Sequence, residues 1–123
     1  VRRLCNNCKR KDVPTKKEQA MIETALKSMP APYKNYKKEI EVFRATGCNV
    51  CNTIGYKGRV GIFEAFLIDD AIEKLILENP SEAEIRKEAK RQGMLTLFED
   101  GILKVLNGMT SMEELARVAG EEE

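Results

Sequence analysis

The sequence predicts an α+β fold: a small tetracysteine subdomain, then a short β element, then a C-terminal cluster of about four helices. Three observations predict it: two separated Cys-x-x-Cys pairs, a glycine-rich and β-branched segment behind the second pair, and repeated helix-start signatures. We expect residues 1–56 to form the tetracysteine subdomain and residues 57–123 to form the strand and the helices. No stretch approaches the roughly 20 apolar residues that span a membrane.

The cysteines of the chain form two pairs, Cys5 with Cys8 and Cys48 with Cys51. A two-residue spacer lets both thiolates of a pair turn toward one ion, so the sequence predicts a tetrahedral zinc site made of all four sulfur atoms. Such a site joins two distant segments. Because sulfur takes every coordination position, no position is left for water or substrate, and we expect the zinc to be structural.

Disulfides and a redox pair are the two other common uses of cysteines at this spacing. Disulfides need an oxidising compartment, and the sequence has no apolar secretory segment. A thioredoxin-like redox pair needs a Cys-x-x-Cys that opens a helix after a buried strand, and neither pair has that context. Zinc is therefore favoured over both.

Catalytic motifs are missing from the sequence. It has no histidine, which excludes Ser-His-Asp and Cys-His nucleophiles and every metal site that contains histidine. It also has no G-x-x-x-x-G-K-[ST] phosphate loop, no G-x-G-x-x-G turn and no G-x-S-x-G elbow. We expect that this chain catalyses no reaction by itself.

The formal net charge of +1 hides a strong asymmetry. Residues 1–59 carry 14 Lys/Arg against 5 Asp/Glu, whereas residues 60–123 carry 7 against 15. A basic half can offset the negative charge of four zinc-bound thiolates, contact acidic surfaces of neighbouring subunits, or bind a polyanion. The last possibility supports an alternative function, a free-standing zinc-ribbon-like module that binds nucleic acid, but no stacking ladder or recognition helix is evident.

The helices are predicted by their starts. The pattern S/T-x-x-E, in which two side chains satisfy free backbone N–H groups, begins at Thr15, Ser81, Thr96 and Ser111. The first of these helices has an apolar face and should end at Pro30. A further helix should run from Asp69 to a stop at residues 79–80, with Ile72, Leu75 and Ile76 on one face.

Two segments are expected to be strands. Tyr36, Ile40 and Phe43 fit a strand or a helical turn, and we favour a strand over residues 40–44. Glycines at residues 55–61 indicate a turn or bulge, and the β-branched and aromatic run up to Ile68 predicts a buried strand. A strand with this many apolar residues needs a larger sheet to bury it. We therefore expect the strand to form the edge of a larger domain.

Read together, these motifs resemble one family. They are the basic V-R-R-L before the first Cys-x-x-Cys, the second Cys-x-x-Cys, the run G-Y-K-G-R-V-G-I-F-E of residues 55–64, and G-M-L-T-L at residues 93–97 followed by E-D-G at 99–101. The ordered set is similar to the C-terminal region of type II secretion and type IV pilus assembly ATPases. The resemblance covers nearly the whole chain.

The resemblance implies a hexameric cytoplasmic motor that hydrolyses ATP with Mg²⁺ and associates with the inner membrane through a platform protein. It makes Cys5, Cys8, Cys48 and Cys51 the ligands of the family's zinc subdomain, and it places the phosphate loop upstream of this chain. Arg59 is expected to face the nucleotide in the complete protein, although pairing with Glu64 or with the zinc shell would explain it equally well.

Overall fold

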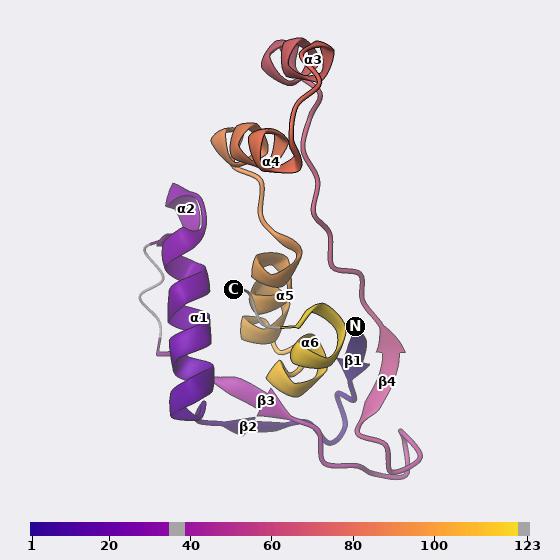
Figure 1. Cartoon of the computed structure of the whole chain (residues 1–123). Coiled ribbons are helices and arrows are strands. Elements are labelled where there is room, and N and C mark those ends of the chain that lie inside the picture. The colour runs from indigo at the N-terminus through magenta and orange to yellow at the C-terminus, as the bar shows by residue number, and fades with distance from the viewer. Residues whose placement is uncertain (35–38, 121–123) are drawn as a thin grey trace.

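The computed structural model describes residues 1–34 and 39–120, and Tyr36 lies outside them. In this part of the chain, four short strands and six helices are present (Figure 1). In chain order they are β1 (Arg2–Leu4), β2 (Arg10–Asp12), α1 (Lys16–Ser28), α2 (Ala31–Lys34), β3 (Val42–Arg44), β4 (Tyr56–Arg59), α3 (Asp70–Leu77), α4 (Glu82–Arg91), α5 (Leu97–Leu106) and α6 (Met112–Ala119). The α+β prediction, with its close cysteine cluster, is confirmed.

The four strands form two antiparallel pairs. The strand before the first cysteine pair, β1, joins the strand after the second, β4, while β2 joins β3. Each cysteine pair therefore lies in the connection between two strands, and the nested pairing of β1 with β4 and of β2 with β3 brings both connections together. The ladder of β1 and β4 is irregular, and Gly58 in β4 has a φ of +81°, which confirms the expected bulge.

All four predicted helix starts are confirmed. Thr15, Ser81, Thr96 and Ser111 each accept a hydrogen bond from the backbone N–H three residues later. Thr15 and Thr96 have the reciprocal bond from the glutamate as well. In α6 the corresponding glutamate, Glu114, is instead bound by two arginines.

Prolines shape the end of α1. Met29 caps the helix and Pro30 follows, as predicted. The short helix α2 begins directly afterwards and was not predicted. Pro32 is the second residue of α2. The N–H groups in the first turn of a helix have no partner inside the helix, so a proline, which lacks an N–H, is tolerated there.

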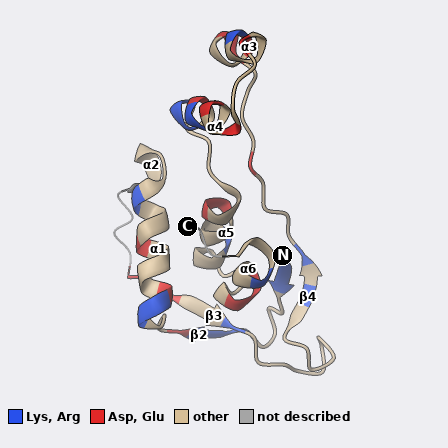
Figure 2. Ribbon diagram, in the orientation of Figure 1, with Lys and Arg blue, Asp and Glu red and all other residues tan. Residues whose placement is uncertain are grey.

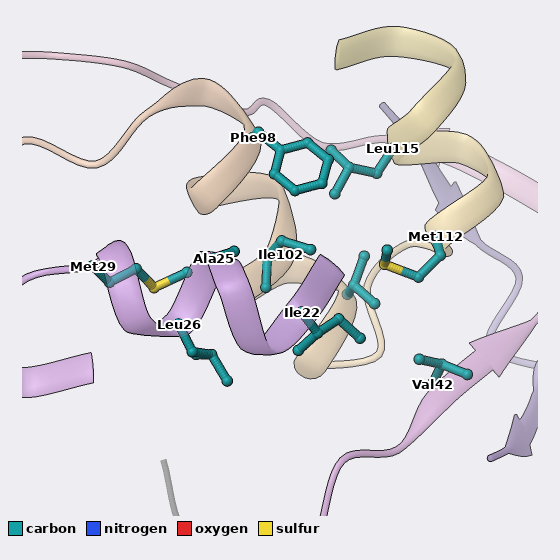
Figure 3. Close-up of a cluster of buried hydrophobic side chains, with 10 residues drawn as sticks. Ile22, Ala25, Leu26, Met29, Val42, Phe98, Ile102, Met112 and Leu115 are labelled. Atoms are coloured by element: carbon teal, nitrogen blue, oxygen red, sulfur yellow. The ribbon is translucent and has the colours of Figure 1, made fainter. Parts of the chain in front are cut away.

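A single apolar cluster joins α1 and β3 to α5 and α6 (Figure 3). Its buried members are Ile22, Ala25, Leu26, Met29, Val42, Phe98, Ile102, Val105, Met112 and Leu115. The 3.6-residue spacing of the apolar positions in α1 puts them on the side that faces α5, where they contact this cluster. Helices from both halves of the sequence therefore share one core.

The prediction of a buried strand up to Ile68 is wrong. The strand ends at Arg59. Beyond Val60, whose N–H donates to the Val1 carbonyl, the segment has no ladder partner among the described residues. Its apolar side chains lie largely in solvent, with exposed fractions of 70% for Phe63, 77% for Leu67 and 68% for Ile68. The sheets in the described part of the chain have two strands each and do not cover these side chains. The apolar composition of the segment indicated burial but could not show whether a covering sheet exists.

The extended segment leads to the helical hairpin of α3 and α4, which projects from the rest of the structure (Figure 1). The Gln92 side chain ties Leu67 to the base of the hairpin, because it donates to the Leu67 carbonyl and accepts from its N–H. In α3 only Ile72 is buried, while Ile76 and Leu77 are exposed. None of the described helices is both long and apolar enough to cross a membrane.

Candidate metal centre

The structure brings all four cysteines into one cluster. Their sulfur atoms lie within 4.8 Å of one another, with Cys5 and Cys51 buried and the other two half-buried. Three of the sulfur–sulfur distances are 3.8, 3.8 and 3.7 Å. An ideal tetrahedron with metal–sulfur bonds of about 2.3 Å has edges of about 3.8 Å, so the cluster fits the tetrahedral all-sulfur geometry typical of zinc.

The same distances exclude disulfides in this structure. A sulfur–sulfur bond is about 2.0 Å long, and all four cysteines are free thiols. A redox pair of the thioredoxin type is equally unsupported, because neither Cys-x-x-Cys opens a helix. The cluster can hold one metal ion.

The second cysteine turn depends on two glycines with positive φ. Gly47 precedes Cys48 at φ +109°, and a Cβ there would lie 2.6 Å from the Thr53 carbonyl oxygen. Gly55, at φ +88°, lies so close to Ala45 that a Cβ would be 2.7 Å from the Ala45 Cβ. Both positions require glycine, because a side chain would be strained and would clash with backbone or with a short rigid side chain.

Amide groups point at the sulfur atoms. The Cys8 sulfur accepts from the Gly47 N–H at 3.3 Å, and the Cys51 sulfur accepts from the N–H groups of Cys48 and Gly55 at 3.3 and 3.2 Å. The Asn7 side chain donates to Cys48 at 3.2 Å. These bonds favour thiolates, which are the form that binds a metal.

The thiol pKa values follow these contacts. The Asn7 amide does most to lower the pKa of Cys48, to about 6. Burial acts to raise the pKa of Cys51, but the two N–H groups on its sulfur outweigh burial and lower it. Burial raises the pKa of Cys5 to about 11. A divalent cation in the cluster would supply the positive charge that Cys5 needs to ionise.

Lysine and arginine side chains do not donate to these sulfur atoms in the described part of the chain, although the sequence placed several beside them. Figure 2 shows the basic residues on β1, β2 and β4. Lys9 donates to the Gly108 carbonyl, and Lys11 pairs with Glu41. Amide groups therefore make the direct hydrogen bonds to the sulfur atoms in the described part of the chain.

Arg59 is exposed at the end of β4, opposite Arg2. Among the residues that the structure describes, none forms an ion pair with its side chain. Glu64, the partner suggested by the sequence, pairs with Arg86 instead. Arg59 thus lies at the same end of the ladder as the start of the extended segment, and its guanidinium is available to a further ligand.

Sequence reasoning missed Asn7 and Gly47 as parts of the centre. Asn7 stands inside the first Cys-x-x-Cys spacer, where its amide reaches across to the second pair. Gly47 stands directly before the second pair. Their positions next to the cysteines could have indicated a role in the metal centre. That each donates a hydrogen bond to a sulfur atom of the other cysteine pair follows only from the contact between the two turns.

Comparisons with known proteins place the chain in one family. The family model of the type II/IV secretion system protein matches residues 1–117. The type IV pilus assembly ATPase PilB of Acinetobacter baylyi is 38% identical over 98% of this chain and 20% of its own length. The type II secretion system ATPase E of Vibrio cholerae is 36% identical over 98% of this chain and 22% of its own length.

A third relative, the PilB of Thermus thermophilus, is 35% identical over 94% of this chain and 12% of its own length. The chain thus spans between 12% and 22% of the length of these three relatives. The matched region includes all four cysteines, Arg59 and the motif at residues 93–101. The chain belongs to the type II/IV secretion system protein family.

Proposed function

We propose that this chain is the C-terminal zinc-binding part of a hexameric ATPase that powers type IV pilus assembly or type II protein secretion. Its role is structural and partner-docking. The observation that carries the proposal is the sulfur cluster of Cys5, Cys8, Cys48 and Cys51, three of whose edges measure 3.7–3.8 Å, as a tetrahedral zinc requires. The relatives named as pilus assembly and secretion ATPases support the rest.

ATP hydrolysis with Mg²⁺ is assigned to other parts of the parent protein. The sequence of this chain has no phosphate loop, and a zinc ion with four sulfur ligands keeps no open position for a reacting water. Residues 1–56 form the metal-clamped unit in this proposal, and residues 57–123 form the unit with the C-terminal helices. The core shared by α1, α5 and α6 would make the two units move together.

The exposed segment after β4 supports docking on a larger body. The Val60 N–H donates to the Val1 carbonyl at 2.9 Å, so the pairing of β1 and β4 continues to the start of that segment. Beyond it, Phe66 and Leu67 line one side of an open hollow of about 440 Å³. Neighbouring subunits and the rest of the ATPase are the proposed occupants of this apolar surface.

The proposed location is the cytoplasmic face of the inner membrane, reached through the platform protein of the assembly machinery. The proposal rests on the relatives that are named as pilus assembly and secretion ATPases and on the opposite charges of the two halves, which suit contacts between subunits. Nucleic acid is not a proposed partner. A free-standing zinc-ribbon-like module is disfavoured because the family match extends through α5 to residue 117 in α6.

We expect Cys48→Ser in the full-length parent to abolish most pilus or pseudopilus assembly while ATP turnover stays within about twofold. Loss of one ligand opens the metal site and loosens the unit that transmits domain movement to the partner. Assembly and ATP turnover of the purified hexamer are measured in parallel. Asn49→Ser, at the exposed neighbouring position, is the matched control; a proportional loss of both activities would indicate misfolding and contradict the proposed role.

Arg59 is proposed to face the nucleotide in the full-length protein. Replacing Arg59 with alanine should lower ATP turnover about tenfold or more, because an arginine can bind a phosphate through two N–H groups and stabilise developing charge. Arg59→Lys should rescue little, since an ammonium lacks this fork. Lys57→Ala, on the same exposed strand, is the control, and unchanged kinetics of Arg59→Ala would discard the proposal.

A further inference from the structure

The connection between α5 and α6, residues 107–111, contacts the chain on both sides of the first cysteine pair. The Leu4 N–H donates to the Met109 carbonyl at 2.9 Å, and the Lys9 ammonium donates to the Gly108 carbonyl at 2.9 Å. Leu4 directly precedes Cys5 and Lys9 directly follows Cys8. The α5–α6 connection therefore binds the first cysteine turn at both of its ends.

A second set of contacts reaches the start of α6. The Tyr56 hydroxyl lies 2.6 Å from the Ser111 hydroxyl, which is also the N-cap of α6 and accepts the Glu114 N–H. Tyr56 directly follows Gly55, whose N–H donates to the Cys51 sulfur. The Thr110 hydroxyl, fully buried, donates to the Arg2 carbonyl at 2.9 Å.

Glu114 adds a buried charge to this junction. Its side chain has an exposed fraction of 0% and pairs with Arg2 at 2.7 Å and with Arg117. Burial acts to raise the Glu114 pKa, but the hydrogen bonds from Arg117 and Arg2 outweigh it and hold that pKa below its usual range. Arg2 also lies 4.3 Å from the centre of the Tyr56 ring. One of the two cations that stabilise this carboxylate thus comes from β1.

We propose that the metal site and α6 form a latch, in which metal binding holds the two cysteine turns and thereby fixes α6 against the rest of the fold. The inference rests on the metal site of the proposed function. Without metal, the short β1 and β4 segments would lose their main constraint. Ser111 and Thr110 would then lose their partners on these segments, and Glu114 would lose Arg2, one of its two arginines. Helix α6 has eight residues, too few to stay helical without tertiary contacts.

A static packing model makes a different prediction. Met112 and Leu115 bury α6 against α5 whether or not metal is bound. If these apolar contacts suffice, removing the metal leaves α6 protected. The latch instead requires coupling, and coupling between two sites is reciprocal: changes at the α6 junction must lower metal affinity from a distance.

The test uses the 123-residue chain and Zn²⁺ alone as the probe. Hydrogen exchange of the α6 amides is measured with zinc and after chelation, and zinc affinity is measured by competition with a chromophoric chelator. We expect faster exchange of α6 without zinc, and an affinity about five- to tenfold lower in Tyr56→Phe and Thr110→Val. Thr110→Ser keeps the hydroxyl and should retain the original affinity.

Ser28→Ala is the matched control for general destabilisation. It removes a hydroxyl that donates to the buried Glu99 carboxylate, between α1 and α5 and away from the junction. Its zinc affinity should stay within about twofold of the original. If zinc binds but α6 exchange and the variants' affinities do not change, or if Ser28→Ala loses as much affinity, the latch is overturned. Failure to bind zinc at all overturns the latch and also the metal site on which it rests, an outcome distinct from the first two.

Discussion

Chelating the metal should remove amide protection across residues 1–56, with the largest loss in the cysteine turns and the strand pairs. The strands have three or four residues each, and the two strand pairs, β1 with β4 and β2 with β3, meet at the cysteine cluster. Zinc bound by four thiolates can contribute on the order of 10 kcal/mol to folding. Hydrogen exchange followed by mass spectrometry measures the change segment by segment.

Metal specificity supplies the control for this result. Zn²⁺ added back should restore protection, whereas Mg²⁺ should not, because a hard cation prefers oxygen ligands to thiolates. Cys48→Ser should resemble the chelated protein without any chelator. A metal-stripped chain that keeps its protection in the cysteine turns would show that the strands need no metal, and would refute the structural role.

The second large effect is expected from Gly101→Ala in α5. A Cβ at Gly101 would lie 2.2 Å from a methyl carbon of Leu115, which is fully buried in the shared core. Helices α5 and α6 therefore pack so closely that an added methyl must displace the buried Leu115 side chain or shift one of the helices. We expect a loss of about 1–3 kcal/mol in the free energy of unfolding, measured by urea denaturation of the zinc-loaded chain.

A double-mutant cycle separates this clash from other effects of alanine. Leu115→Ala alone should cost about 2–5 kcal/mol through the cavity that it creates. Combined with Gly101→Ala it should cost less than the sum of the two, because the new methyl fills part of that space. Additive costs would mean that the two positions are not in contact, contrary to the structure.

Local signals in the sequence determined where the helices begin and which residues form the metal cluster. Thr15, Ser81, Thr96 and Ser111 cap helices because a short hydroxyl side chain reaches the N–H three residues on, an interaction contained in four consecutive residues. The cysteine spacing likewise indicates a shared ion without knowledge of the fold. The strand near Phe43 was located correctly, although it begins two residues later than expected.

Only the tertiary structure decided what those elements contact. The run up to Ile68 has the composition of a buried strand yet lies exposed, because burial depends on a partner that composition does not contain. Glu114 fits a capping box but binds Arg2, more than a hundred residues away in sequence, since two cations stabilise a buried carboxylate more than one N–H does. Short-range hydrogen bonds can be read from neighbouring residues, whereas pairing and burial follow from long-range contacts that exist only once the chain has folded.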